Sequence, residues 1–514
     1  MTKRNHIIKL LAMTNNKEYM NNYKKLENEL STISNFKNIL SILYWDIAVN
    51  MPIGSGESRT NEMVSLTSLV HSLVKSPLLK ELVSRAKEEA KNLDEWQNAN
   101  IREIERKILD ANCIDEELQK RIVAATTKAE LVWRKARNTN DYNLFKPHLQ
   151  KVLDYTREVA KVRAGVFNCS PYDALIDMYD PSRTSSEIKK VFSYVKENLS
   201  ELIGKVLEKQ KSQKELVKST ELSPEIQKNI GKRIMEIMQF DTTKGRLDES
   251  THPFCGGTPN DIRLTIRYDK DNFISGLMGI IHETGHALYE QNLPEMYKGQ
   301  PVGRAKGMAF HESQSLFMEM QVGRSREFTE FLAKLLRDEF NLKSEEYSAD
   351  NLYRAITKVE PDFIRVNADE VTYPMHVILH FEIEELLISG ELNLDELPNF
   401  WDSKMQEYLG IKPRSFSEGC LQDIHWSSGW FGYFPAYTNG AIIASMVMKK
   451  VKEINKSVKD DILKGDFSNL NNYLNKNFRN FGSLKNSPDL LKSASGEENI
   501  NPEVFIKYLE EKYL

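Results

Sequence analysis

Two histidines, His282 and His286, stand four residues apart in the segment HETGH, with Glu283 between them. Residues at i and i+4 share one face of a helix, so both imidazoles can reach one metal ion while Glu283 projects close to it. Zinc held by three protein groups lowers the pKa of a bound water to roughly 7, and a neighbouring carboxylate can take its proton. The spacing predicts a metal site in which Glu283 is the catalytic base.

The alternative is a chance arrangement of common residues, in which the two histidines are a hydrogen-bonded pair in the core. The segment before them is apolar almost all the way round the helix, through Phe273, Ile274, Leu277, Met278, Ile280 and Ile281. Two imidazoles and a carboxylate on such a helix are costly to bury unless a partner satisfies them. Burial therefore favours the metal.

A third ligand is required, and the next helical stretch, residues 309–324, offers Glu312. His311 precedes it, but neighbours in a helix point in different directions, so only one of the two readily faces the site. We expect Glu312 to bind the metal. We expect His311 to contact substrate or to support a ligand, the alternative being a plain surface histidine.

A second pair of histidines at i and i+4 is formed by His376 and His380. No acidic residue lies between them, and the surrounding pattern is that of a packed helix. We expect core or supporting roles for this pair.

The elements that position these groups follow from the spacing of apolar residues. In residues 261–269, Ile262, Leu264 and Ile266 alternate with polar residues, which predicts a strand shortly before the histidine helix. Pro294 is expected to close that helix, because its ring cannot continue the backbone hydrogen bonds.

Long amphipathic helices are predicted for residues 15–240, and again for the tail 450–514 with a break near GSLKNSPD. Breaks between helices are expected at 50–59, 168–173 and 179–186, each too short for a flexible linker. One apolar stripe is expected to run through residues 100–137, with Ile101, Ile104, Ile108, Leu118 and Ile122 on it.

Composition excludes several classes of protein. The 514 residues carry 70 basic and 74 acidic side chains spread along the chain, a net charge of -4 that indicates neither nucleic acid nor an acidic membrane as partner. The N-terminus lacks a signal-peptide pattern, and no apolar run approaches the roughly 20 residues of a membrane-spanning helix. Four scattered cysteines without a CxxC pair indicate a reducing compartment, so we expect a cytoplasmic protein.

Six motifs, in order, resemble those of the thermostable carboxypeptidase family, also called carboxypeptidase Taq. They are HPF (252–254), DIRLT (261–265), HETGH (282–286), HESQ (311–314), IRVNAD (364–369) and GCLQDIHW (419–426). The resemblance extends through LYWDIAVNMP (43–52) and GWFGYFPAYTNG (429–440), so it covers essentially the whole chain.

This resemblance implies a mostly α fold: a large multi-helix single domain over residues 1–514, with a deep central cleft and a small β-sheet next to the HExxH helix. Such a fold is similar to that of neurolysin and angiotensin-converting enzyme. The helical N-terminal part would span about 1–240, and the metal and substrate site would lie within about 250–440.

The activity that the resemblance implies is release of single C-terminal amino acids from peptides with a free C-terminus, with proline disfavoured. It also implies a homodimer and one Zn²⁺, or Co²⁺, per chain, with His282, His286 and Glu312 as ligands and Glu283 as the catalytic acid and base.

An exopeptidase must recognise a terminal carboxylate, and the guanidinium fork of arginine does this with two parallel hydrogen bonds. Arg365 is the leading candidate and Arg263, on the predicted strand, the second; His252 of the first motif is a further candidate for substrate contact. The alternative for Arg263 is a side chain that faces solvent or that forms a structural pair with Asp261 or Asp369.

Tetrahedral intermediates need hydrogen-bond donors aimed at the developing oxyanion. His425 and Tyr433 lie in a stretch rich in glycine and aromatic residues that suits a loop lining a cleft, although simple packing is the alternative. We expect Asp423 to orient a neighbouring imidazole. We expect Asp369 to contact residues of the site rather than the metal or the substrate.

Two rival functions stay open. An oligoendopeptidase or a dipeptidyl carboxypeptidase on the same scaffold would use the same metal chemistry, and would differ in the distance from the carboxylate-binding arginine to the ion. A helical binding protein without catalysis is the second rival, and the complete set of ligands and base argues against it.

Overall fold

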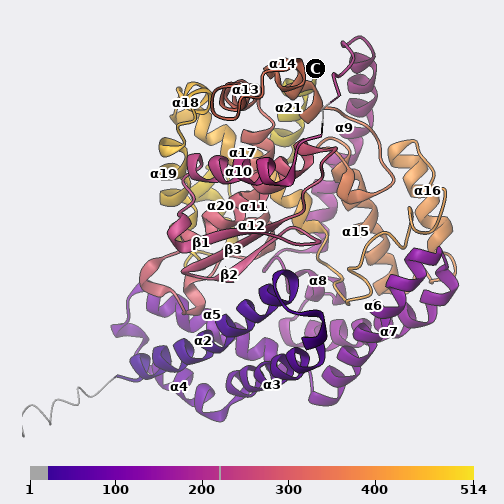
Figure 1. Ribbon diagram of the computed structural model, residues 1–514. Helices are drawn as coiled ribbons and strands as arrows, with labels where there is room; N and C mark the ends of the chain where they lie inside the picture. Colours follow the sequence, from indigo (N-terminus) through magenta and orange to yellow (C-terminus); the bar gives the residue numbers. More distant parts are fainter. Residues whose placement is uncertain (1–20, 219–220) are drawn as a thin grey trace, which may run out of the picture. The chain divides into compact units, whose positions relative to one another are not determined.

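The computed structural model describes residues 21–218 and 221–514 (Figure 1). They form helices along most of their length and one three-stranded sheet, so the predicted mostly α fold with a small sheet is confirmed. The chain divides into two compact units. The described part of the first comprises residues 21–112, 294–304 and 482–484, and that of the second comprises the rest of the chain from Cys113 onward.

The first unit consists of amphipathic helices around their own apolar core, which includes Leu26, Leu79 and Ile104. Its elements are α2 (Asn22–Val49), η1 (Ile53–Ser55), α3 (Gly56–Lys75), α4 (Pro77–Glu88), η2 (Ala90–Asn92), α5 (Glu95–Cys113), η4 (Glu295–Tyr297) and η5 (Pro301–Gly303). The break predicted at 50–59 is shorter than expected, because α3 already begins at Gly56.

The stripe predicted through residues 100–137 is wrong, because this segment holds two helices. The carboxylate of Asp115 accepts a hydrogen bond of 2.7 Å from the backbone N–H of Leu118 and so caps the N-terminus of α6 (Glu116–Thr139). Ile101 and Ile104 are buried in the core of the first unit, whereas Leu118 is buried in the core of the second. Apolar spacing continues across the cap although the helix does not.

The second unit contains the sheet and the remaining helices. The helices after α6 are α7 (Tyr142–Phe167), α8 (Pro171–Ile176), α9 (Ser185–Lys211), α10 (Pro224–Ile237), η3 (Thr242–Lys244), α11 (Phe273–Gln291), α12 (Met308–Leu316), the π-helix η6 (Phe317–Gly323), α13 (Arg326–Phe340), η7 (Glu345–Tyr347), α14 (Ala349–Ile356), η8 (Arg365–Asn367), α15 (Tyr373–Ser389), α16 (Leu397–Leu409), α17 (Pro435–Ile454), α18 (Val458–Lys464), α19 (Ser468–Asn477), η9 (Arg479–Phe481), α20 (Ser487–Ser495) and α21 (Pro502–Tyr513). The helical tail predicted for 450–514 is thereby confirmed.

The sheet has the order β1-β3-β2, with β1 (Gly245–Glu249) parallel and β2 (Phe254–Thr258) antiparallel to the central β3 (Asp261–Ile266). The alternation in 261–269 therefore predicted a strand correctly, although the strand ends at Ile266. The sheet lies beside α11 (Figure 1), and a Cβ added to Gly279 would come within 2.8 Å of Ile266 Cδ1. The absence of a side chain there lets the histidine helix pack directly on β3.

Two further glycines bring α11, α12 and α17 close together. A Cβ on Gly285 would lie 2.4 Å from the backbone oxygen of Gln314, and a Cβ on Gly440 would lie 2.8 Å from Cβ of Glu312. Because both positions lack a side chain, α12 carries Glu312 directly against the HETGH segment. The helix α11 ends at Gln291, shortly before Pro294 as expected.

None of the helices in the described ranges combines the length and the apolar character needed to cross a membrane. None of the four cysteines forms a disulfide.

Candidate metal centre

Three side chains from two helices of the second unit meet at one point. His282 and His286 lie one turn apart on α11, and Glu312 lies on α12. One ligand atom from each lies within 4.8 Å of the other two. The Nε2 atoms of His282 and His286 are 3.7 Å and 3.6 Å from the two carboxylate oxygens of Glu312. The structure thus brings together the three predicted ligands.

The donor atoms and their spacing fit a catalytic zinc ion. Ligand atoms at about 2.1 Å from a shared ion, in tetrahedral directions, are about 3.4 Å apart. The measured separations of 3.7 Å and 3.6 Å are close to this value. Two nitrogens and one oxygen leave a fourth position for water or substrate. The side chains of His282 and His286 are 21% and 12% exposed, so that position is accessible to solvent.

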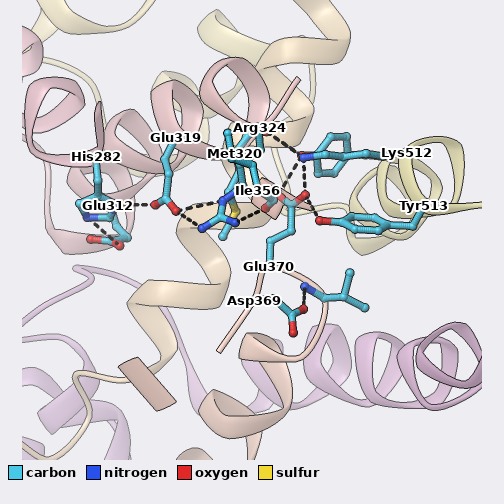
Figure 2. A network of polar contacts seen from close by, with 12 residues as sticks. His282, Glu312, Glu319, Met320, Arg324, Ile356, Asp369, Glu370, Lys512 and Tyr513 are labelled. Carbon is cyan, nitrogen blue, oxygen red and sulfur yellow. Dashed lines mark hydrogen bonds and ion pairs between the residues drawn. The ribbon is translucent and has the colours of Figure 1, made fainter. Parts of the chain in front are cut away.

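Glu319 is the hydrogen-bond partner of Nδ1 of His282, the ring nitrogen that does not face Glu312. Its Oε2 lies 2.9 Å from Nδ1 of His282, so Nδ1–H donates to the carboxylate and the lone pair of Nε2 faces Glu312. Oε1 of Glu319 accepts two hydrogen bonds from Arg324, of 3.1 Å from Nε and 2.7 Å from Nη2 (Figure 2). Burial would raise the pKa of Glu319, but Arg324 and His282 lower it to about 2. Glu319 therefore stays ionised and fixes the imidazole.

Negative charge dominates the surroundings of His282. Burial lowers the pKa of this imidazole, but Glu312 and Glu319 raise it to about 10. Charges that favour a proton on a nitrogen also favour a cation bound to that nitrogen, and a bound metal displaces the proton. The electrostatics therefore favour a divalent cation at Nε2.

His311 supports His286 in a similar way. Its Nδ1 lies 2.6 Å from Nδ1 of His286, and its Nε2 lies 2.8 Å from Oε1 of Glu290. If His286 binds a metal through Nε2, its Nδ1–H donates to His311, and His311 Nε2–H donates to Glu290. Burial, with the neighbouring His311 and His282, keeps the pKa of His286 well below its ordinary value, which favours the neutral form that a ligand requires.

Glu283, the predicted base, lies beside the first ligand on α11 and is buried. Burial raises its pKa to about 7, an effect that His282 opposes and Glu312 reinforces. A carboxyl group with a pKa near neutrality can both accept and return a proton.

Arg365, the leading candidate for carboxylate recognition, is 4% exposed and holds Asp423 with two hydrogen bonds, of 3.2 Å from Nε and 2.7 Å from Nη2. Its Nη1 donates to Tyr373 Oη at 2.6 Å. Asp423 also lies 3.0 Å from Nε2 of His380 and 3.6 Å from Nδ1 of His425. Asp423 thus lies within ion-pair distance of two imidazoles, neither of which is a metal-ligand candidate.

The loop that carries His425 and Tyr433 is fixed by Glu384 of α15. This buried carboxylate accepts hydrogen bonds from Trp426 Nε1 at 2.8 Å, from the N–H of Gly432 at 2.7 Å and from Tyr172 Oη at 2.9 Å. Burial raises the pKa of Glu384 to about 7 although these donors oppose the increase. Gly432 has a φ of +85°, and a Cβ there would lie 2.7 Å from a backbone nitrogen of α8.

Three tyrosine side chains lie within reach of the charge of Glu312. Burial raises the pKa values of Tyr433, Tyr437 and Tyr373 above their usual range, and the charge of Glu312 adds to each increase. The ring of His425 lies 5.7 Å from that of Tyr433, and its Nε2 is 3.4 Å from Tyr437 Oη. The hydroxyl groups of these three tyrosines are therefore near enough to Glu312 for its charge to affect them.

The remaining predicted residues have local partners. Arg263 is in the structural pair with Asp261 that was its alternative, through hydrogen bonds of 3.0 Å and 2.6 Å. Asp369 accepts hydrogen bonds from the N–H and the hydroxyl of Thr372, ahead of α15. The side chain of His252 is exposed, and its backbone oxygen accepts a hydrogen bond of 2.6 Å from Ser250 Oγ.

His376 and His380 are core residues. Both are almost completely buried, and the ring of His380 stacks on Phe434 with the centroids 3.9 Å apart. Burial, reinforced by the neighbouring His380, lowers the pKa of His376 to about 3. Neither belongs to the group of ligand atoms around Glu312.

Sequence reasoning missed Glu319 and Glu290. Both could have been found from helical spacing, because Glu319 follows Glu312 by seven residues and Glu290 follows His286 by four.

Known proteins resemble this chain along almost its whole length. A family model described as Carboxypeptidase Taq (M32) metallopeptidase matches residues 25–513. Carboxypeptidase 1 of Bacillus subtilis is 32% identical over 94% of this chain and 96% of its own length. Thermostable carboxypeptidase 1 of Pyrococcus furiosus is 33% identical over 92% and 95%, respectively. The structure of metallocarboxypeptidase 1 of Trypanosoma cruzi superimposes with a TM-score of 0.93 at 38% identity, covering 96% of this chain and 99% of that one.

Proposed function

Because the chain belongs to the carboxypeptidase Taq family of metallopeptidases, we propose that it is a zinc carboxypeptidase that releases single amino acids from the free C-terminus of peptides. The observation that carries the proposal is the convergence of His282, His286 and Glu312 within 4.8 Å, with Glu283 next to the first ligand.

His282, His286 and Glu312 would hold the cation, which would supply a Lewis acid for the scissile carbonyl group and for a water molecule. Glu283 accepts a proton from the attacking water and delivers it to the departing amino group, which a pKa of about 7 permits in both directions. Glu319 and His311 keep the two imidazoles in the orientation that directs Nε2 at the shared space. Tyr433 and His425 donate hydrogen bonds to the oxyanion that develops on the carbonyl oxygen.

Recognition of the terminal carboxylate is assigned to Arg365, with Arg263 and His252 as further substrate contacts. The hydrogen bonds to Asp423 and Tyr373 engage three of the five N–H donors that a guanidinium has. The other two are directed at the substrate in this proposal. Asp423 thus holds the guanidinium while the substrate binds to it.

The family resemblance supports the finer features of the proposal. They are one Zn²⁺ per chain, which Co²⁺ can replace, a homodimer, low activity on C-terminal proline, and a place in the cytoplasm. Sedimentation of the purified protein and metal analysis test the homodimer and the stoichiometry directly.

Mass spectrometry of an unlabelled peptide during digestion tests the activity. We expect a ladder in which one residue at a time disappears from the C-terminus, and one zinc ion per chain in the same preparation. Internal cleavage would indicate an oligoendopeptidase, release of dipeptides would indicate a dipeptidyl carboxypeptidase, and a folded protein without metal or activity would indicate a binding protein.

A matched pair of peptides with a free and an amidated C-terminus tests the carboxylate contact. We expect the wild type to prefer the free peptide, and Arg365→Ala to lose most of that preference, because the amide offers no charge to the guanidinium. Equal rates of the wild type on both peptides would show that no such contact operates.

A further inference from the structure

We propose that the C-terminal helix α21 positions the metal-binding imidazole of His282 through the π-helix η6 and Glu319. The residues concerned lie far from one another in sequence, since α21 begins at Pro502 and α11 ends at Gln291. The inference rests on the proposed function only in requiring that a divalent cation binds at His282.

The direct contact between the two elements is at the backbone oxygen of Met320, one residue after Glu319. Tyr508 Oη donates to this oxygen at 2.8 Å, and Lys512 Nζ lies 3.3 Å from it (Figure 2). The last four carbonyl groups of a helix lack partners inside the helix, and Met320 is one of the last four residues of η6. Two side chains of α21 therefore cap the element that carries Glu319.

A second contact runs through Glu370, whose side chain is fully buried. Lys512 forms an ion pair with this carboxylate, Tyr513 Oη donates to it at 2.6 Å, and Tyr508 Oη lies 3.0 Å from it. These three partners of Glu370 lie on one helix, α21. The carboxylate in turn attracts the guanidinium of Arg324.

Arg324 completes the connection on the side of the metal. Its two hydrogen bonds to Glu319 Oε1 leave Oε2 directed at His282, and its Nη1 donates to the backbone oxygen of Ile356 at 2.8 Å (Figure 2). Glu319 is therefore held at two points. The backbone oxygen of the next residue, Met320, is hydrogen-bonded to α21, and the Glu319 carboxylate is hydrogen-bonded to Arg324. The contact at Met320 is made by α21 itself, so loosening that helix loosens the element that carries Glu319 and with it the hydrogen bond that orients the imidazole.

The test measures zinc affinity by competition with a chelator in four full-length proteins: wild type, Lys512→Met, Glu319→Gln and the double variant. Loss of a group that orients a ligand typically weakens metal binding about 10–100-fold, which we expect for Glu319→Gln. For Lys512→Met we expect a smaller loss, of about threefold or more, that disappears in the Glu319→Gln background because both changes act through one carboxylate.

Two further variants separate this role from general stability. Lys507→Met lies on the same helix, where the Lys507 side chain is 75% exposed, and we expect it to bind zinc as the wild type does. Tyr508→Phe keeps the buried ion pair but removes the hydroxyl group at Met320, and we expect it to weaken zinc binding even if Lys512→Met fails to fold.

The inference would be overturned if Lys512→Met and Tyr508→Phe both bound zinc as tightly as the wild type. It would also be overturned if Lys512→Met caused the same loss of zinc affinity in the Glu319→Gln background as in the wild type. A wild-type protein that binds zinc tightly but releases no C-terminal amino acids would refute the proposed function and leave this inference intact.

Discussion

Each imidazole of the candidate metal site has two ring nitrogens with different neighbours. Nε2 of His282 and of His286 faces Glu312, whereas Nδ1 of the first meets a carboxylate and Nδ1 of the second meets another imidazole. A carboxylate is a stronger acceptor than a neutral imidazole. His282 is therefore the more firmly oriented of the two ligands, and His286 depends on the smaller interaction with His311.

The base assignment predicts the behaviour of Glu283→Gln. The amide has almost the same shape as the carboxyl group, so we expect zinc content to stay at the wild-type level. It cannot accept the proton of water, so kcat should fall by about 10²-fold or more. Steady-state kinetics and metal analysis of the same preparation measure both quantities, and wild-type hydrolysis by this variant would refute the role of Glu283.

At the scale of elements, the site depends on how closely α11 and α12 approach each other. The atoms that a Cβ on Gly285 would meet, Gln314 O and Ser315 Cα, are backbone atoms at 2.4 Å and 2.5 Å, and backbone cannot rotate away. A single methyl group would thus push Glu312 away from the histidines.

We therefore expect Gly285→Ala to lower the unfolding free energy by about 1–3 kcal/mol or more and to weaken zinc binding. The control is Gly204→Ala in the middle of α9, where a Cβ would meet nothing within 4 Å. The control should be neutral or stabilising by up to about 1 kcal/mol. Wild-type zinc affinity in Gly285→Ala would show that the helix spacing tolerates the methyl group.

The loop anchored by Glu384 predicts a dependence of stability on pH. The pKa of this carboxyl group is about 7 in the folded protein against an ordinary value of 4.5, so the folded state binds the proton more tightly. Its stabilising effect is fully present below pH 4.5 and is lost as the pH rises through 7. The loss amounts to roughly 3 kcal/mol, since each pKa unit corresponds to about 1.4 kcal/mol.

Comparison with Glu384→Gln, which does not titrate, isolates this contribution. We expect the melting temperature of the wild type to fall relative to that of the variant between pH 5 and pH 8. A constant difference between the two proteins over this range would contradict the raised pKa.

For the whole molecule, the sequence predicted the helical class, the strand beside the site and the three side chains that meet there, because each depends on spacing within one or two short segments. It did not predict Arg365 bound to Asp423, since 58 residues separate them and only the fold makes them neighbours. It also missed the cap at Asp115, where apolar spacing continues across a helix boundary. The spacing of apolar residues predicts which face of a helix is buried, but it does not predict which other element covers that face.

Removal of the metal should destabilise the whole protein. A ligand that binds only the folded state stabilises it by about 4 kcal/mol when its free concentration is 1,000 times its Kd. We expect a chelator to lower the melting temperature and added zinc to restore it. The variant His286→Ala should respond to neither, and an equal response in that variant would place the stabilising ion elsewhere.

The π-helix η6 makes the number of residues in the segment after Glu312 as important as their identity. A π-turn accommodates one residue more than an α-turn does. Shortening the segment Phe317–Gly323 by one residue would allow it to wind as a regular α-helix, and later side chains would be rotated by about 100°. The backbone oxygen of Met320 would then no longer meet α21, and Arg324 would no longer meet the carboxylate of Glu319. An alanine scan, which preserves chain length, would not detect this requirement, whereas a one-residue deletion would.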